Sequence, residues 1–476
     1  MKRFFQLLIL FFVVVSCTQS NDSPTPVNTD EKLTIFILND IHGQIDNFAK
    51  VKHLVDQEKT KTNVLLTSAG DIFSGNPIVD NYPQKGYPII DLMNRVGFDV
   101  SVIGNHEFDY GEVNLKARME QANFSWICAN VQTDTSVIPQ PDPYTTITVN
   151  DLKITFLGLV ETDGKENAII PSTHPWRVEN LTFQRPEDVV ANYANVKQTE
   201  ESDLLIALTH LGYSKSGGRL GDYQLATDFP YFDVIIGGHS HSKIDEVVNG
   251  IPIYQAGSYL NHIGKIELTI SNKIVKTINY ELIDLNTITE EDPTIRNIID
   301  SYNDEPLFKE VVGFSELNHG RYQVGNFTAD ALRKQMNVDI AFQNTGGVRA
   351  NLNYGDITTR EIFNILPFNN SAISYSMTVA EIKNFLRGSG AGFYYSGVSI
   401  KLRNSDIEIT DLSGNIIPDS TILTVGVNDY IPAVYDTYFN SSKVVSTQTD
   451  AETVISFLKE KNSIVNYPTS ENYFEF

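Results

Sequence analysis

The chain has 476 residues, of which 41% are hydrophobic and 20% charged, and 36 basic against 59 acidic residues give a formal net charge of -23. Domains usually hold about 100–200 residues, so this length predicts more than one domain, and the apolar content excludes disorder for most of the chain. The acidic balance excludes a protein that grips nucleic-acid polymers, because such binding needs clustered Lys and Arg to neutralise phosphates.

The N-terminal residues have the pattern of an export segment. Two basic residues precede an apolar run at 4–15, which is shorter than the roughly 20 residues that cross a bilayer as a helix. We therefore expect a signal peptide at 1–16. A small residue followed by Cys17 resembles a bacterial lipobox, so Cys17 is expected to carry lipid and anchor an exported protein to the bacterial cell envelope. The alternative is an ordinary export signal. Polar residues 17–32 would form a flexible tether.

Short apolar runs rich in β-branched residues alternate with helix-like segments beyond this tether. This alternation is typical of an α/β domain, which we place at 33–286. The runs lie at 33–38, 64–67, 100–103, 154–160, 204–208 and 234–236.

A charged stretch at 287–310, helix-like at 295–302, is expected to link this domain to a second mixed region at 311–476. Within the second region the sequence predicts helices at 327–336 and 379–386. It also predicts strands around Ala341, Ser399 and Thr424.

Polar clusters follow several of the apolar runs, and they hold five of the nine histidines. The candidates are Asp40, His42, Asp71, Asn105, His106, His210, His239 and His241. Because ligands bind beyond the carboxyl ends of strands in α/β sheets, we expect these clusters to converge. Imidazole and carboxylate ligands without thiolates suit Zn, Mn or Fe. One bridging aspartate can hold two ions about 3.5–4 Å apart, which predicts hydrolysis of a phosphate ester.

These clusters resemble the ordered motifs of the calcineurin-like metallophosphoesterases. The matching motifs are Asp40-Ile41-His42-Gly43, Gly70-Asp71, Gly104-Asn105-His106-Glu107, His210 and Gly238-His239-Ser240-His241. The extension to Phe108-Asp109 is similar to the 5'-nucleotidase family, which includes bacterial UDP-sugar hydrolases and animal ecto-5'-nucleotidases. The resemblance implies a four-layer α/β/β/α catalytic sandwich and a C-terminal α/β substrate-binding domain, with the substrate between them.

The resemblance also assigns two divalent metal ions to this chain. The first ion would be held by Asp40, His42, Asp71 and His241. The second would be held by Asp71, Asn105, His210 and His239. The pair would lower the pKa of a bound water, so that hydroxide is available near neutral pH.

His106 and Asp109 are the expected catalytic pair. In the family the carboxylate orients the imidazole and favours its protonated form, which stabilises developing charge or protonates the leaving oxygen. Glu107 is expected to support the site without binding metal. Packing or surface roles are expected for the histidines outside the motifs, which are His53, His174, His262 and His319.

The second domain is expected to recognise the nucleotide. Asn344 and Arg349 stand in a loop similar to the family's Asn-x-Gly-Gly-x-Arg motif, and Phe368 and Tyr430 resemble the aromatic pair that sandwiches a base. The further substrate-binding candidates are Asp436 and Arg321. The chain has Val434-Tyr435 where the family usually has Gly-Gly, which predicts a narrower or differently shaped pocket.

The resemblance therefore implies a two-metal phosphomonoesterase acting on nucleoside 5'-monophosphates, and on UDP-sugars as a further substrate class. A related enzyme acting on 2',3'-cyclic nucleotides or nucleotide coenzymes is the first alternative. A non-catalytic surface nucleotide-binding lipoprotein is the second. We expect no nucleic-acid polymer and no obligate protein partner.

Overall fold

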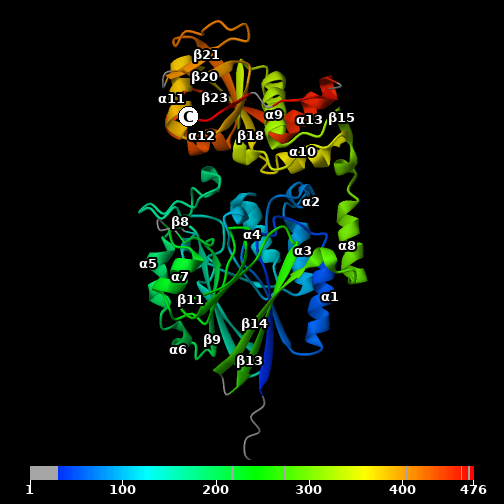
Figure 1. Cartoon of the computed structure of the whole chain (residues 1–476), viewed down its shortest axis with the longest axis vertical. Helices are drawn as coiled ribbons and strands as arrows, with labels where there is room; N and C mark the ends of the chain where they lie inside the picture. The colour runs from blue at the N-terminus through cyan, green and yellow to red at the C-terminus, as the bar shows by residue number, and fades with distance from the viewer. Residues whose placement is uncertain are drawn as a thin grey trace, which may run out of the picture.

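A computed structural model describes residues 30–133, 135–215, 219–271, 274–403, 406–461, 464–469 and 472–476. The expected signal peptide, Cys17 and tether residues 17–29 lie outside the described residues. Figure 1 shows one body built from the described chain up to Asp284 and a second body stacked on it along the long axis. None of the helices in the described part of the chain is both long enough and apolar enough to cross a membrane.

One sheet of the first body has the strand order β14-β13-β1-β2-β3-β4. Strands β1 to β4 are parallel neighbours, and β13 and β14 continue the sheet in antiparallel fashion. The bounds are β1 (Glu31–Leu38), β2 (Asn63–Ser68), β3 (Val100–Val102), β4 (Ser125–Ile127), β13 (His262–Ser271) and β14 (Ile274–Asp284).

A second sheet has the order β11-β12-β10-β9-β7-β6, with a parallel centre formed by β7, β9, β10 and β12. The bounds are β6 (Tyr144–Val149), β7 (Leu152–Val160), β9 (Leu204–His210), β10 (Val234–Ile236), β11 (Lys243–Val248) and β12 (Ile251–Ala256). A short ribbon joins β5 (Val131–Gln132) to β8 (Thr182–Phe183).

The two sheets pack face to face. Alternating side chains of β1, including Leu33 and Ile35, share a buried cluster with Ile154 and Phe156 of β7. Because successive strand residues point to opposite faces, Phe36 of β1 instead packs with the helices on the outer side. The helices around the sheets are α1 (Phe48–Lys59), α2 (Pro77–Asp80), α3 (Tyr87–Val96), α4 (Glu112–Gln121), α5 (Pro186–Val190), α6 (Val196–Thr199) and α7 (Asp222–Asp228).

The outer faces of both sheets are covered by helices. Phe48 of α1 and Ile89 of α3 are buried with Phe36 on one side, and Val189 of α5 and Leu225 of α7 are buried on the other. The expected four-layer α/β/β/α sandwich is confirmed.

Helix α8 (Pro293–Asn303) runs up one side of the molecule from the first body to the second (Figure 1). Asp292 caps its N-terminus by accepting a hydrogen bond from the amide of Ile295, and proline occupies the first turn. The helix lies within the charged stretch that was expected to link the domains.

The second body is built on a sheet of order β23-β18-β22-β16-β19-β25. Its bounds are β16 (Ile340–Asn344), β18 (Ser371–Thr378), β19 (Phe393–Ser396), β22 (Ile422–Asn428), β23 (Lys443–Thr449) and β25 (Tyr473–Phe474). The smaller sheets comprise β15 (Val311–Ser315), β17 (Gly355–Thr358) and β24 (Ile464–Val465), with the hairpin β20 (Ser399–Arg403) and β21 (Asp406–Thr410).

Helices cover this sheet on both sides. Helix α11 buries Ile382 and Phe385 against it, while α9 and α13 pack on each other and α9 contacts β16 and β19. Helix α9 begins at Arg321, six residues before the expected start, and includes Gly325, whose added Cβ would lie 2.3 Å from Tyr394. Close packing against Tyr394 therefore requires glycine at this position, although glycine is a poor helix former. The helices are α9 (Arg321–Met336), α10 (Thr359–Ile365), α11 (Val379–Ser389), α12 (Tyr430–Val434) and α13 (Asp450–Lys461).

Short 3-10 helices complete the described elements and include three that reach the site. They are η1 (His106–Phe108), η2 (Pro175–Arg177), η3 (Ala191–Tyr193), η4 (Leu285–Thr287), η5 (Pro306–Lys309), η6 (Thr345–Gly347) and η7 (Asp436–Tyr438).

Candidate metal centre and substrate pocket

The predicted metal ligands come from the carboxyl ends of parallel strands in both sheets. Asp40 and His42 follow β1, Asp71 follows β2, and His210 ends β9. Asn105 follows β3, and His239 and His241 follow β10. Because the sheets are stacked, these ends meet at one edge of the sandwich, below the C-terminal domain.

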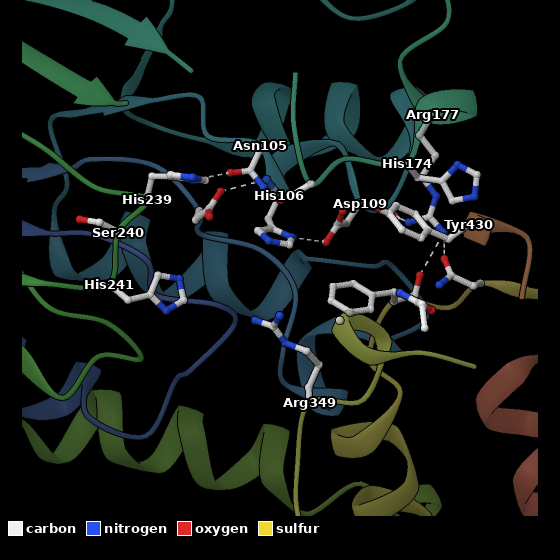
Figure 2. A pocket seen from close by; sticks show the side chains of 16 residues that line it. Asn105, His106, Asp109, His174, Arg177, His239, Ser240, His241, Arg349 and Tyr430 are labelled. Atoms are coloured by element: carbon white, nitrogen blue, oxygen red, sulfur yellow. Dashed lines mark hydrogen bonds and ion pairs between the residues drawn. The ribbon is translucent and has the colours of Figure 1, made fainter. Parts of the chain in front are cut away.

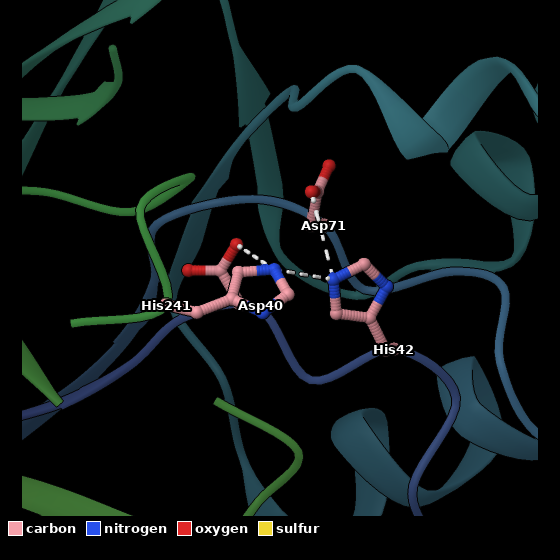
Figure 3. Close-up of side chains that lie close together, drawn as sticks. All are labelled: Asp40, His42, Asp71 and His241. Carbon is pink, nitrogen blue, oxygen red and sulfur yellow. Dashed lines mark hydrogen bonds and ion pairs between the residues drawn. The ribbon is translucent and has the colours of Figure 1, made fainter. Parts of the chain in front are cut away.

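Among the described residues, one group of possible ligand atoms consists of Asp40, His42, Asp71 and His241, with these atoms within 4.8 Å of one another. His42 Nε2 lies 3.0 Å from His241 Nε2 and 3.8 Å from Asp71 Oδ2. His241 Nε2 lies 3.4 Å from Asp40 Oδ1. Figure 3 shows these side chains pointing toward a shared centre.

A second group in the described part of the chain consists of Asp71, His210 and His239. His210 Nε2 lies 3.0 Å from Asp71 Oδ2. Asn105 stands beside this group, with its Oδ1 3.1 Å from His239 Nδ1. Asp71 thus belongs to both groups, as expected of a bridging carboxylate.

The chemistry of the first group fits a divalent cation. Burial, together with the positive charge of His106, lowers the pKa of His42 to about 3. Burial also lowers the pKa of His241 to about 4. Both imidazoles are therefore neutral at physiological pH and keep the lone pairs that metal binding requires. Neutral imidazoles and carboxylates that converge in this way are a donor set suited to Zn, Mn or Fe.

The backbone at most of these ligand positions is left-handed. The φ angles are 49° at Asp40, 49° at His42, 53° at Asp71, 75° at His239 and 52° at His241. Such φ values are uncommon outside glycine and cluster at functional sites. Sharp turns of this kind let consecutive motif residues send their side chains back over the strand ends.

Glu107 holds the loop that carries Asp71 in place through hydrogen bonds to its backbone. Its buried carboxylate accepts hydrogen bonds from the amides of Asp71 (3.0 Å), Ile72 (2.6 Å) and Gly104 (2.5 Å). At Gly70, φ is +82° and an added Cβ would lie 2.8 Å from His210 Nδ1, so only glycine fits. The support expected from Glu107 is thus mechanical, and no ligand atom of Glu107 belongs to the two groups described above.

Glu161 is a neighbour of the site that sequence reasoning missed. Its buried carboxylate lies 3.0 Å from His239 Nε2 and 2.6 Å from Arg219 Nη1. Such a carboxylate fixes the orientation of a metal-binding imidazole. Glu161 directly follows β7, which pairs with the strand that ends at His210, so its place at a strand end was the available clue.

His106, at the start of η1, and Asp109, directly after it, form the expected pair, with His106 Nδ1 2.7 Å from Asp109 Oδ2. Burial opposes charge on His106, but the carboxylates of Asp109 and Asp71 prevail and raise its pKa to about 9. Despite burial, His106 holds the pKa of Asp109 below its usual range. The Ser74 hydroxyl also donates to Asp109.

A cavity of about 480 Å³ lies between the domains beside this pair (Figure 2). It is bounded by Asp71, Asn105 and His106 on one side and by predicted substrate residues on the other. The latter are Asn344, Arg349, Phe368 and Tyr430. The Phe368 ring lies 6.0 Å from the His106 ring at an interplanar angle of 18°, and the Arg349 guanidinium lies 5.6 Å from the Phe368 centroid.

Arg321 and Asp436 do not line this cavity. The Arg321 guanidinium donates to the backbone carbonyl of Val348, at 2.9 Å through Nε, and so supports the loop that carries Arg349. Asp436 is exposed on η7. The departure from Gly-Gly does not reach the cavity lining either, because Tyr435 packs on Phe385 and Val434 is 39% exposed.

The loop before η2, together with η2 itself, supplies further lining residues that the sequence did not indicate. Ser172, His174 and Arg177 face the cavity. His174 was expected to have a packing or surface role, and it is buried, as a packing residue would be, but its Nε2 lies 3.2 Å from Asp429 Oδ1 in the other domain. No recognisable motif marks this loop.

Comparison with known proteins places both domains. The model for the calcineurin-like phosphoesterase domain matches residues 33–243, and that for the 5'-nucleotidase C-terminal domain matches residues 308–438. A 5'-nucleotidase of Vibrio cholerae is 26% identical and covers 80% of this chain and 81% of its own length. The structure of a 5'-nucleotidase precursor from Thermus thermophilus shares the fold, with a TM-score of 0.77, 21% identity, and coverage of 93% of this chain and 98% of that one.

A trifunctional nucleotide phosphoesterase protein of Bacillus subtilis, YfkN, is 28% identical over 85% of this chain. The chain spans only 32% of the length of that relative and 40% of the length of another from the same organism, the endonuclease YhcR. The two matched domains, in this order and over this fold, show that the chain belongs to the 5'-nucleotidase family of calcineurin-like metallophosphoesterases.

Proposed function

We propose that this chain hydrolyses nucleoside 5'-monophosphates to nucleoside and phosphate with two divalent metal ions. The observation that carries the proposal is the position of Asp71. Its carboxylate belongs to both ligand groups and faces the cavity that Phe368 and Tyr430 also line. Phosphoester chemistry and nucleoside recognition therefore meet in one space.

The residues that would hold the ions are Asp40, His42, Asp71 and His241 for one, and Asp71, Asn105, His210 and His239 for the other. When bound, such a pair supplies Lewis-acid polarisation of the phosphoryl oxygens and an acidified water. Asp71 would reduce repulsion between the ions, and Glu107 and Glu161 would keep the ligand side chains in place.

His106 is placed to act on the substrate itself. Asp109 holds its Nδ1, so the opposite edge of the ring is free for the substrate phosphoryl group in the cavity. Its raised pKa keeps it protonated at neutral pH, which lets it stabilise developing charge or give a proton to the leaving oxygen. Arg349 offers a second positive charge from the other side of the cavity.

Phe368 and Tyr430 would bind the base, and Asn344 would contribute hydrogen bonds. Base stacking on aromatic faces tolerates different bases, so we expect breadth among nucleotides. Arg321 would act through the Arg349 loop, and Asp436 remains a predicted substrate residue from family resemblance alone.

Chromatography of the products formed by the full chain, together with phosphate release, tests the proposal, because the first cleavage of a 2',3'-cyclic nucleotide, NAD or UDP-glucose releases no inorganic phosphate. The panel should hold nucleoside 5'-monophosphates, UDP-glucose, a 2',3'-cyclic nucleotide, NAD and glycerol phosphate, with Mn, Zn, Co or Mg added back after chelation. Preferred turnover of 5'-monophosphates supports the proposal. Preference for the cyclic nucleotide or NAD would favour the first alternative, and no turnover with any metal would favour a binding protein.

We also propose that the protein is exported and anchored to the cell envelope by lipid on Cys17. The apolar run at 4–15 and the small residue before Cys17 support this. Mass spectrometry of the membrane fraction should find a diacylglyceryl-modified N-terminal peptide beginning at Cys17, and Cys17→Ser should remove it. An unmodified peptide starting elsewhere would contradict the anchor.

A further inference from the structure

The loop from Ser172 to Arg177, here called the 172–177 segment, belongs to the catalytic domain but reaches the C-terminal domain. Its η2 turn packs against α12. Both of its ends are tied to the loop that carries Asn105 and Asp109. Thr173 Oγ1 donates to the Asn105 carbonyl at 3.0 Å, and Arg177 Nη1 donates to the Asp109 carbonyl.

The far side of the same segment touches both aromatic residues that are proposed to hold the base. Arg177 Nη2 donates to the carbonyl of Phe368 at 3.0 Å and to Asn370 Oδ1 at 3.3 Å. The His174 ring meets the Tyr430 ring edge to face, with centroids 5.9 Å apart. Figure 2 shows His174, Arg177 and Tyr430 gathered at one end of the cavity.

Two more contacts fasten the segment across the domain boundary. His174 Nε2 lies 3.2 Å from the carboxylate of Asp429, the residue directly before Tyr430. Lys443 Nζ lies 4.2 Å from the centroid of the Trp176 ring, a cation–π contact. Three residues of one short segment, His174, Trp176 and Arg177, thus contact the second domain, and the buried His174 contact is shielded from solvent competition.

Deepening the proposed function, on which this inference rests, we infer that the 172–177 segment is a specificity-determining element for nucleosides. The segment sets the spacing between the Phe368 and Tyr430 rings. It also connects these two residues to the loop that carries the catalytic pair. Its ligand is the planar base of a nucleoside, because the segment positions the ring faces of Phe368 and Tyr430. The residues that face the phosphate lie on other loops.

The inference separates base recognition from phosphoryl chemistry. Loss of an Arg177 contact moves Phe368 without removing a metal ligand or the His106–Asp109 bond. A small ester that lacks a ring, such as glycerol phosphate, has nothing to place between the aromatics. Its hydrolysis is therefore expected to be insensitive to the cross-domain contacts of the segment.

The test uses the full chain and direct binding of adenosine and uridine by calorimetry, which needs no turnover. Arg177→Gln should raise the Kd for both nucleosides on the order of 10-fold, as expected for disturbed stacking. Its kcat/KM for AMP should fall similarly and by more than its kcat/KM for glycerol phosphate, because the lost hydrogen bond to the Asp109 carbonyl affects both substrates. Arg185→Gln, which removes an exposed arginine paired with Asp188 in the same domain, is the matched control.

Two His174 variants keep the inference testable if Arg177→Gln folds poorly. His174→Phe retains a ring against Tyr430 but loses the bond to Asp429, and His174→Gln retains a donor but loses the ring. Each should weaken nucleoside binding less than His174→Ala, with glycerol phosphate hydrolysis preserved in all.

Unchanged nucleoside Kd in Arg177→Gln and His174→Ala, with a wild type that binds nucleosides, would overturn the inference and leave the proposed function standing. Equal loss of AMP and glycerol phosphate hydrolysis would also overturn it, because the segment would then act on the catalytic loop alone. A wild type that neither binds nucleosides nor hydrolyses AMP would instead end the proposed function and this inference with it.

Discussion

The carboxylate of Asp71 lies 3.0 Å from His210 Nε2, although Asp71 follows a strand of one sheet and His210 ends a strand of the other. The contact exists because the carboxyl ends of β2 and β9 meet where the sheets are stacked. A centre for two ions therefore depends on the sandwich as a whole and is absent from either sheet alone.

Replacing Asp71 with Asn is expected to lower hydrolysis of every substrate by about 10³-fold or more, because the bridging charge that holds both ions is removed. Metal analysis and phosphate release measure the two effects. Asp245→Asn, at an exposed carboxylate on β11, should leave both unchanged. Normal turnover by the Asp71 variant would contradict the two-ion site.

Replacing Glu161 with Gln should weaken metal binding about 10–100-fold, since His239 loses the carboxylate that orients it. Calorimetric titration with Zn or Mn measures the affinity directly. Glu246→Gln, whose carboxylate pairs with Lys215 at the surface, serves as the control. An unchanged affinity would show that His239 needs no such support.

Replacing Asp109 with Asn should reduce kcat by roughly 10²-fold or more and shift its pH dependence. Although burial opposes it, Asp109 contributes to the raised pKa of His106, about 9, so the protonated form is present below pH 9 and lost above it. Without that carboxylate the pKa falls, and the alkaline limb of the kcat profile should move to lower pH. A profile that stays in place would exclude His106 as the titrating group.

Replacing Phe368 with Ala should cost AMP turnover about 1–3 kcal/mol in kcat/KM through lost stacking, and spare glycerol phosphate. Parallel kinetics on the two substrates make the comparison. Tyr354→Ala removes an exposed aromatic of the same domain as a control. Equal losses on both substrates would refute the stacking role.

Asp450 gives a prediction about stability. Burial raises its pKa to about 8, so between pH 4 and pH 8 the folded state binds a proton that the unfolded state has released. Unfolding free energy should therefore decline as pH rises through this range. Asp450→Asn should flatten that decline in urea titrations at pH 5 and pH 8. An equal decline in the variant would show that a group other than Asp450 causes the pH dependence of the unfolding free energy.

The α/β alternation and the strand-end positions of the ligand candidates could be predicted from local patterns, while the four-layer sandwich and the assignment of ligands to two ions came from the family resemblance. Buried parallel strands read as apolar runs, and β1, β2, β7, β9 and β10 all lie where such runs stand. Polar residues directly after those runs must lie at strand ends. The convergence of Asp71 and His210 then follows from the stacking of the sheets.

The part of the site that is formed by contacts between the two domains could not be predicted from local sequence patterns. His174 and Arg177 lie in a loop without periodicity, and their contacts are with Asp429 and Phe368, about 190–255 residues away. Glu161 was similarly hidden, since its partner His239 depends on how two loops fold back. At Val434-Tyr435 a change of motif suggested an altered pocket, and in the structure Tyr435 packs on Phe385 and neither residue lines the cavity.

The left-handed backbone at Asp40, His42, Asp71, His239 and His241 has an evolutionary consequence. The left-handed φ angles at these five positions favour glycine, but metal binding requires an imidazole or a carboxylate. Each non-glycine residue in this conformation costs about 1–3 kcal/mol of folding stability. A descendant freed from selection for hydrolysis would gain robustness by drifting toward glycine there. The five side chains thus hold their places at a cost in folding stability.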